Sequence, residues 1–139
     1  MANLAALSSA ALVAATILLL LSPASASSYG NVLKSGQILQ AGGTLTLNNY
    51  KFIMQNDCNL VLYAGEEALW SSRTQGKGSD CRLVLQNNGE LYIISGSDKR
   101  TVWRSETGGP YGFYALVLQQ NGNVVVYGNS VWSTGTLVA

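Results

Sequence analysis

Apolar and polar residues alternate along most of the chain after residue 26, in short runs that turn-forming residues separate. Runs such as YKFIMQ (50–55), LVLY (60–63) and VVVY (124–127) have the period of two that is typical of half-buried strands. No later window keeps a 3.6-residue apolar period over about eleven residues or more. The pattern therefore predicts an all-β chain of about a dozen short strands.

One phrase of nine residues occurs three times, as QNDCNLVLY (55–63), QNNGELYII (86–94) and QQNGNVVVY (119–127). Each copy joins two strand-like runs through Asn, Asp or Gly, which is the signature of a hairpin. A tryptophan follows each copy, at Trp70, Trp103 and Trp132. Three repeats predict three similar sheets. Closing the sheets around a threefold axis would remove most exposed edges and would place the three Trp in the core.

The segment before the first phrase, VLKSGQILQAGGTLTLNN (32–49), also has strand-like alternation. It predicts one further hairpin, which would turn at residues 41–43.

The first 26 residues differ from the rest, because they contain no charged side chain and include an apolar run at 12–21. They end in Ala24, Ser25 and Ala26, a pattern of small residues that suits signal peptidase. The run is shorter than the roughly 20 residues needed to span a bilayer. A secretory signal cleaved near Ala26 is therefore predicted, with an uncleaved anchor as the alternative. Residues 27–139 are predicted to form one domain.

The charges are few and nearly balanced, with 8 Lys and Arg, 7 Asp and Glu, and no His. Such a chain lacks the basic surface of a nucleic-acid-binding protein and offers no charge for an anionic membrane. Without His, neither a Ser-His-Asp nor a Cys-His arrangement can form. The adjacent Glu66 and Glu67 fit an exposed loop better than a glycosidase pair. We expect no catalytic residues.

The two cysteines, Cys58 and Cys81, fit a secreted chain with one disulfide. The loop that they would close has roughly 23 residues, and the cross-link would stabilise the fold by about 3 kcal/mol. Two buried free thiols are the alternative, and they suit an oxidising compartment less well. A zinc site would lack ligands because the chain has no His. We expect neither a metal nor another cofactor.

The first phrase places polar side chains at alternate positions, so they project from one face of an extended strand. The row is Gln55, Asp57, Asn59, Val61 and Tyr63. Its mixture of donors and acceptors matches the vicinal hydroxyls of a neutral sugar, and the valine could contact the apolar C–H face of the ring.

The turn alone could explain the Asn and Asp residues, and Gln could simply end a strand. The third copy returns Gln119, Asn123, Val125 and Tyr127 at the same offsets. Turn chemistry does not require that Gln and Tyr recur, so the repetition favours a binding site.

The pattern Q-x-D-x-N-x-V-x-Y, repeated with two Cys and a Trp after each copy, resembles the bulb-type mannose-binding lectins of monocot plants, the snowdrop-type family. The resemblance covers residues 31–135. It implies a type II β-prism of three four-stranded antiparallel sheets with pseudo-threefold symmetry, the disulfide Cys58–Cys81, and a shallow mannose site on each sheet.

The resemblance also assigns roles by position. In the family, Gln and Tyr contact the O3 and O4 side of mannose, and Asp and Asn contact the axial O2. The first site would be complete. The third site would bind more weakly, because Asn121 stands where the family has Asp. The middle copy is degenerate, since Tyr92 and Ile94 replace Val and Tyr. The carried-over residues are Gln55, Asp57, Asn59, Val61 and Tyr63; Gln119, Asn121, Asn123, Val125 and Tyr127; and the degenerate Gln86, Asn88 and Glu90.

The implied partners are mannose-containing glycans and glycoproteins, with no nucleic acid and no insertion into a membrane. Some family members form homodimers by exchanging the C-terminal strand, here residues 129–136, and others are monomers. We expect secretion and a role in plant defence, with the vacuole as the alternative location. Other family members have lost sugar binding and act through protein contacts, as taste-modifying or inhibitory proteins. That function is the alternative for this chain.

Overall fold

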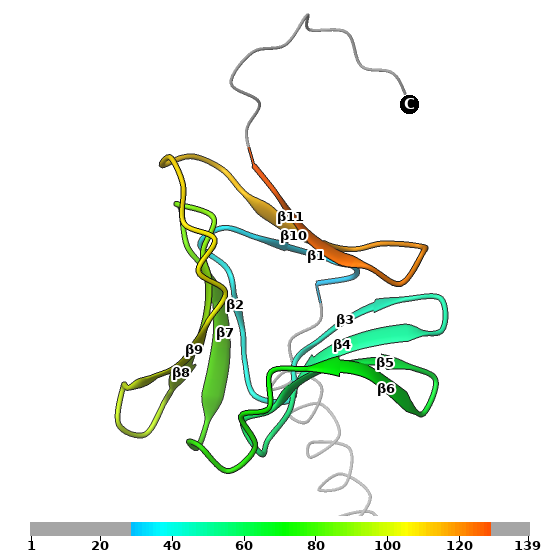
Figure 1. Cartoon of the computed structure of the whole chain (residues 1–139), viewed down its shortest axis with the longest axis horizontal. Helices are drawn as coiled ribbons and strands as arrows, with labels where there is room; N and C mark the ends of the chain where they lie inside the picture. The colour runs from blue at the N-terminus through cyan, green and yellow to red at the C-terminus, as the bar shows by residue number, and fades with distance from the viewer. Residues whose placement is uncertain (1–28, 129–139) are drawn as a thin grey trace, which may run out of the picture.

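The computed structural model describes residues 29–128, and all regular structure in this range is β-strand. The strands form three antiparallel sheets that surround one central axis like the sides of a prism (Figure 1). In the described range no helix has the length and apolar character needed to cross a membrane. The predicted all-β prism is confirmed. The expected signal segment (1–26), Trp132 and the expected exchange strand (129–136) lie outside the described residues.

The sheet that carries the first phrase has the order β3-β4-β5-β6. Its strands are β3 (Thr44–Leu47), β4 (Tyr50–Met54), β5 (Leu60–Ala64) and β6 (Glu67–Ser71). Strands β4 and β5 form the predicted hairpin, in which Met54 is paired with Leu60 across the turn. The pairing of β5 with β6 shifts between Leu62 and Tyr63, so a bulge lies beside the polar row.

The other two sheets are built around the second and third hairpins. The second sheet, in the order β2-β7-β8-β9, contains β2 (Ile38–Leu39), β7 (Cys81–Leu85), β8 (Leu91–Ser95) and β9 (Thr101–Arg104). The third, in the order β1-β10-β11, contains β1 (Val32–Lys34), β10 (Ala115–Leu118) and β11 (Val124–Tyr127). Within residues 29–128 the third sheet has three strands where four were expected.

The predicted hairpin at 32–49 is wrong. The chain does turn at 41–43, where the Gly43 N–H donates to the Gln40 carbonyl at 2.8 Å. However, β2 pairs with β7 and β3 pairs with β4, so the turn carries the chain from one sheet to another. Gly43 is needed there, because a Cβ would lie 2.9 Å from both the Gln40 carbonyl oxygen and the Leu39 side chain.

The core lies where the inner faces of the three sheets meet. Buried and half-buried positions alternate along the two central strands of the second sheet, β7 (Cys81–Leu85) and β8 (Leu91–Ser95). The buried side chains are mostly leucines, and the set includes Leu33, Leu39, Leu45, Leu60, Leu83, Leu85, Leu116 and Leu118. In these strands the alternation that predicted the strand also predicted its buried face.

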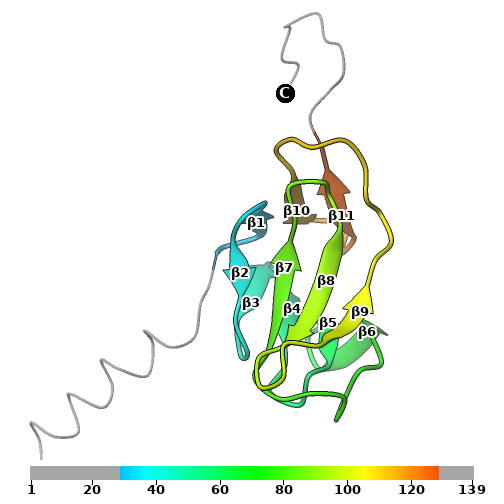
Figure 2. The same cartoon turned by 90° about the vertical axis from the view of Figure 1, so that its left-hand side faces the viewer.

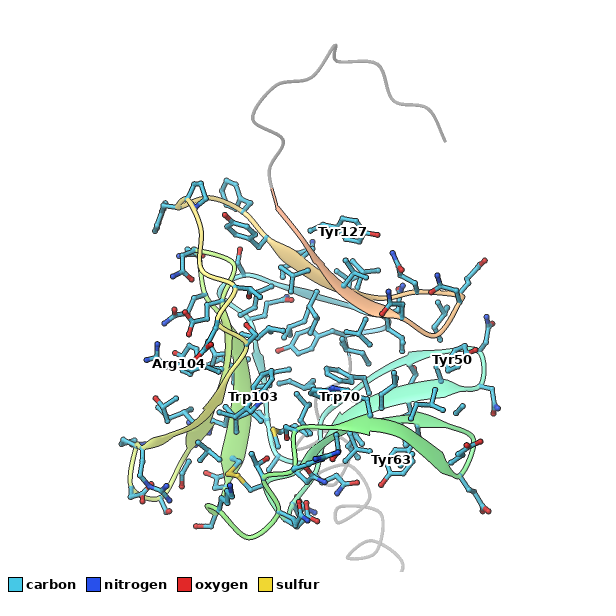
Figure 3. The ribbon with its side chains drawn as sticks, viewed as in Figure 1. Tyr50, Tyr63, Trp70, Trp103, Arg104 and Tyr127 are labelled. Atoms are coloured by element: carbon cyan, nitrogen blue, oxygen red, sulfur yellow. A yellow bond between two sulfur atoms is a disulfide. The ribbon has the colours of Figure 1, made fainter. Side chains whose placement is uncertain are left out.

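The expected role of the tryptophans in the core is met only in part. Trp70 and Trp103 point toward the axis (Figure 3) and contact each other edge to face, with ring centroids 5.9 Å apart. Trp103 is half-buried, but Trp70 keeps 43% of its surface exposed. Both line an apolar cavity of about 610 Å³ between the sheets.

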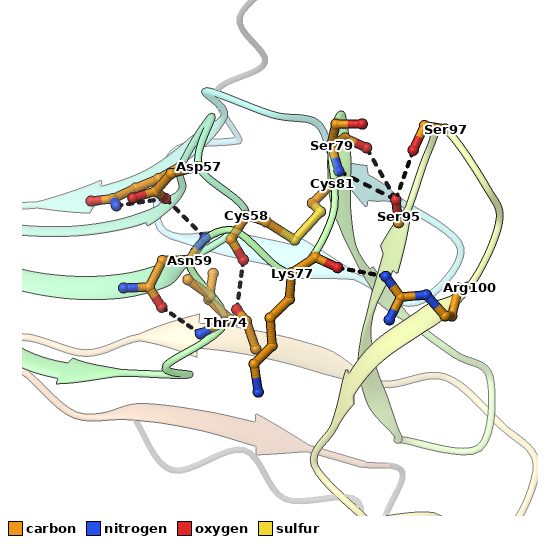
Figure 4. The surroundings of a disulfide bond; sticks show 12 residues. Asp57, Cys58, Asn59, Thr74, Lys77, Ser79, Cys81, Ser95, Ser97 and Arg100 are labelled. Carbon is orange, nitrogen blue, oxygen red and sulfur yellow. Dashed lines mark hydrogen bonds between the residues drawn. A yellow bond between two sulfur atoms is a disulfide. The ribbon is translucent and has the colours of Figure 1, made fainter.

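The expected disulfide is present between Cys58 and Cys81, whose Cα atoms lie 5.1 Å apart. It joins the turn between β4 and β5 to the start of β7, and it is fully buried (Figure 4). The cross-link therefore connects the turn of the first polar row to the neighbouring sheet.

Candidate functional site

The first polar row lies on the turn between β4 and β5 and continues along β5. The turn is closed by two backbone hydrogen bonds, from Gln55 N–H to the Asn59 carbonyl (2.9 Å) and from Cys58 N–H to the Gln55 carbonyl (3.1 Å). The second and third hairpins make the same two bonds at the same offsets. The three turns are thus one backbone structure with different side chains.

The side chains of the first row are hydrogen-bonded to one another. The Tyr63 hydroxyl donates to Gln55 Oε1 at 2.6 Å, and Gln55 Nε2 donates to Asp57 Oδ1 at 3.0 Å. The backbone N–H of Asn59 also donates to Asp57 Oδ1, at 3.0 Å. These bonds fix the row before any ligand arrives, and they leave Asp57 Oδ2 as a second acceptor. Figure 3 shows Tyr63 on the outer face of the sheet.

Two residues that follow β6 hold the side-chain amide of Asn59. Its Oδ1 accepts from the Thr74 N–H at 3.2 Å and from the Ser72 hydroxyl at 3.3 Å. The buried Thr74 hydroxyl donates to the carbonyl of Cys58 at 2.6 Å (Figure 4). Because the carbonyl of this amide is used within the protein, Asn59 presents its NH2 group as a donor to a ligand.

Sequence reasoning missed Ser72 and Thr74. They follow Trp70 by two and four positions, and the second repeat has Ser105 and Thr107 at the same offsets from Trp103. There the Thr107 hydroxyl donates to the Gly89 carbonyl at 3.0 Å. A Ser two residues after Trp70 and Trp103, and a Thr four residues after each, is the sequence signal that could have identified them.

Val61 differs from the expectation of an exposed methyl pair, because it is only 2% exposed. Ile53 and Ser71 lie opposite it on the two neighbouring strands. Lys51, paired with Tyr63 across the sheet, places its Nζ 5.7 Å from the centroid of the tyrosine ring. That separation is within the range of a cation–π contact, so a positive charge lies at the edge of the first row.

The third row, on the turn between β10 and β11, repeats part of this arrangement. Gln119 Nε2 donates to the Tyr127 hydroxyl, and the Asn123 N–H donates to Asn121 Oδ1 at 3.0 Å. The side-chain Oδ1 of Asn123 accepts from the N–H of the next residue, Val124, at 3.0 Å. Gln119, Asn121, Asn123, Val125 and Tyr127 therefore lie along one hairpin as predicted, with an amide in place of the carboxylate.

The second row has the same turn as the first, but different side chains line its outer face. Asn88 Oδ1 accepts from the Glu90 N–H at 3.0 Å, as Asp57 does in the first row. The Glu90 carboxylate, only 13% exposed, is paired with Arg104 at 3.1 Å. At the next offsets, Tyr92 and Ile94 are half-buried. Ile94 therefore stands where Tyr63 supplies a hydroxyl in the first row, and the position of the Asn59 amide is taken by an ion pair.

Within the described range, no group of three or more His, Cys, Asp or Glu side chains is placed to hold a metal ion. The polar groups of the three rows are amides, carboxylates and phenols. Such a set can donate hydrogen bonds to a ligand and accept them from it.

No protein-family model matches the sequence. The mannose-specific lectin of Aloe arborescens is 46% identical over 106 residues, which cover 76% of this chain and 97% of the Aloe protein. Mannose-specific lectin 2 of Colocasia esculenta is also 46% identical over 106 residues, and there the match spans only 40% of the relative's length.

The structure of the snowdrop (Galanthus nivalis) mannose-specific agglutinin, complexed with methyl-α-D-mannoside, is 41% identical to this chain. It superposes with a TM-score of 0.70 over 78% of this chain and 99% of the snowdrop chain. The fold, the repeated phrase and the extent of these matches agree with one another. The chain belongs to the bulb-type, or snowdrop-type, family of monocot mannose-binding lectins.

Proposed function

We propose that this protein is a secreted lectin that binds terminal α-D-mannose on glycans, and that its first site is the strongest. The observation that carries the proposal is the hydrogen-bonded row Tyr63–Gln55–Asp57, which is ordered without a ligand. The relatives named above as mannose-specific support the choice of sugar.

The chemistry of the row suits a hexose with an axial hydroxyl. The free oxygen of Asp57 can accept a hydrogen bond, and the Asn59 NH2 can donate one to the same hydroxyl. Tyr63 and Gln55 can do the same for neighbouring hydroxyls. A bond to a carboxylate is stronger than one between neutral groups, so the contact with Asp57 would distinguish an axial from an equatorial O2.

The third site would bind more weakly, because Asn121 is neutral. A single shallow sugar site binds with a Kd of roughly 1 mM. Two sites on one chain, or four in a homodimer formed through residues 129–136, would increase the strength of binding to clustered glycans by about 100-fold or more. Multi-angle light scattering of the chain with and without residues 129–139 tests whether that segment forms the dimer.

Calorimetric titration with methyl α-mannoside and an oligomannoside tests the proposal, with a glucoside as the control sugar. We expect heat with mannose, a large loss in Asp57→Ala and no loss in Asp98→Ala, which removes a carboxylate that also accepts the backbone N–H two residues later but lies outside the three rows. Binding that survives in Asp57→Ala should be lost in the double variant Asp57→Ala with Asn121→Ala. Folded protein that gives no heat at millimolar mannose would refute the proposal.

In that case the chain would act through protein contacts, an alternative supported by the second row, which has lost the sugar-binding set of residues and pairs Glu90 with Arg104 instead. Secretion of the protein and a role in plant defence are part of the proposed lectin function. Export of a fusion that carries residues 1–26, with cleavage near Ala26, tests the first. A feeding assay on plant pests, comparing wild type with Asp57→Ala, tests the second.

A further inference from the structure

Lys51 lies beside the first polar row, at the end of the row opposite to Asp57. It is on β4, directly across from Tyr63 of β5, and its Nζ is 5.7 Å from the centroid of the tyrosine ring. The Tyr63 hydroxyl donates to Gln55, which in turn donates to Asp57. The row therefore has a carboxylate at one end and an ammonium group at the other.

The charge of Lys51 is not balanced by a carboxylate within the described residues. The side chain is exposed, and its cross-strand neighbours, Thr46 and Tyr63, carry no charge. Among residues 29–128, salt bridges are formed by Arg82, Arg100 and Arg104. An ammonium group over the face of a tyrosine keeps its charge and its three N–H donors. Lys51 can therefore bind an anionic group of a ligand.

The position of Lys51 can be compared across the three sheets. In each sheet it is the residue four before the glutamine of the row, and it pairs with the last residue of that row. In the second sheet, whose outer face is turned to the viewer in Figure 2, this residue is Arg82, opposite Ile94. Arg82 is already bound to Asp80 at 2.9 Å. The second sheet therefore has a cation here whose charge is balanced within the protein.

In the third sheet the same position is Ala115, opposite Tyr127. The lysine in that part of the sheet, Lys34, is on β1 and pairs with Ala115, so it lies one strand further from the tyrosine. The third row therefore repeats most polar groups of the first row without a cation across from its tyrosine. It is an internal reference for what Lys51 adds.

We infer that the first row prefers a mannose whose O6 carries an anionic ester, phosphate or sulfate, and that Lys51 determines this preference. The inference rests on the proposed function, in which the O3 and O4 side of the sugar lies against Gln55 and Tyr63. Because C6 is attached to the ring next to C4, a group on O6 extends toward the Tyr63 end of the row. There the Lys51 Nζ donates hydrogen bonds to the ester oxygens, and such charge-assisted bonds are stronger than neutral ones.

The acidic side chains of this sheet oppose the ester only weakly. Asp57 is at the other end of the row, and Glu66 and Glu67 are exposed where β5 connects to β6. At physiological ionic strength, charges in solvent are screened over about 8 Å. The contact with Lys51 is exposed too, so we expect a preference for the ester of about threefold to fivefold at low salt.

NMR titration of the isotope-labelled protein tests the inference, because the side-chain amide signals of Asn59 and Asn123 report the first and third rows separately. The probes are methyl α-D-mannoside, its 6-phosphate and its 6-sulfate, with methyl α-D-glucoside 6-phosphate as the control for the ester alone. At the first row, the Kd for at least one mannoside ester should be about threefold to fivefold lower than for the mannoside, and the difference should shrink in about 0.5 M salt. At the third row we expect no difference. The ester with the lower Kd identifies the anion.

Four variants assign the preference to one position. Lys51→Gln should bring the ratio of the two affinities at the first row close to one, and Lys51→Arg should retain it, because either cation can bind the ester. Lys99→Gln is the matched control, since it removes the same charge from an exposed lysine outside the three rows. Ala115→Lys should raise the ratio at the third row.

Equal affinities of the first row for the mannoside and both of its esters at low salt would overturn the inference. So would an equal loss of the ratio in Lys99→Gln and Lys51→Gln, or an unchanged third row in Ala115→Lys. Binding of the glucoside phosphate as tight as that of the mannoside phosphate would mean that the ester binds as an adventitious ion only. If the neutral mannoside still shifts the Asn59 signals in these cases, the proposed lectin function stands alone. If no mannoside shifts either row, the proposed function itself fails.

Discussion

Each of the three hairpin turns contains one residue with a left-handed backbone, and in the first hairpin that residue is Cys58. Its φ is 75°, and the equivalent residues Gly89 and Gly122 have φ of 84° and 82°. A residue with a side chain in this conformation costs about 1 kcal/mol relative to glycine. Cys58 nevertheless stands there, because the disulfide to Cys81 closes a separation of 23 residues and stabilises the fold by about 3 kcal/mol.

Two double variants separate these contributions. Cys58→Ala with Cys81→Ala loses the cross-link and keeps the backbone strain. Cys58→Gly with Cys81→Ala loses the same cross-link and removes the strain. We expect the free energy of unfolding to fall by about 3 kcal/mol in the first variant and by about 2 kcal/mol in the second.

Urea denaturation, followed by tryptophan fluorescence and by circular dichroism, measures both values. Equal midpoints for the two double variants would refute the strain at Cys58. An alanine double variant as stable as wild type would refute the contribution of the cross-link. The glycine variant is also expected to retain mannose binding at the first site, because the other two turns are formed with glycine.

Three further predictions concern single side chains. Tyr63→Phe removes the hydroxyl that donates into the first row, so calorimetry should show mannose affinity about fivefold to tenfold lower. Thr74→Val leaves the Cys58 carbonyl without its donor and should lower the free energy of unfolding by about 1–3 kcal/mol in urea, whereas Thr74→Ser should stay close to wild type. The backbone N–H of Arg100 is the main cause that lowers the pKa of Asp98. The ionised Asp98 carboxylate therefore stabilises the folded protein fully above the ordinary Asp pKa of about 3.9, and this stabilisation is lost as the pH falls through the lowered pKa of Asp98. Thermal scans should show that acidification destabilises wild type more than Asp98→Asn.

The hairpins and their buried faces could be predicted because both follow from local pattern. The period of two identifies the inner face, and the Asn, Asp and Gly residues after each Gln mark the turns. The segment 32–49 could not be placed in this way. Strand β2 has two residues and pairs with β7, which begins more than forty positions later. The turn at 41–43 looks the same in sequence whether it closes a hairpin or joins two sheets.

The polar row could be predicted in outline and not in detail. Alternation brought Gln55, Asp57 and Tyr63 to one face, and the structure adds the bonds between them. The support of Asn59 comes from Ser72 and Thr74, on the far side of β6, so it depends on how three strands align. The burial of Val61 has the same origin, because neighbours on both adjacent strands flank it.

The three turns also show how one side chain can serve both the fold and the ligand. Asp57, Asn88 and Asn121 each accept, through Oδ1, the backbone N–H two residues later, and the distance is 3.0 Å in every copy. This bond builds the turn, and an amide oxygen makes it at the same distance as a carboxylate oxygen does. The second oxygen is not needed for the turn, and only Asp57 has one. The carboxylate of the first copy is therefore free to serve a ligand without loss to the hairpin, and the other two copies could exchange it for an amide without loss of fold. The same argument ranks the sites, with the first row above the third, and it explains why the second hairpin persists after its row has changed.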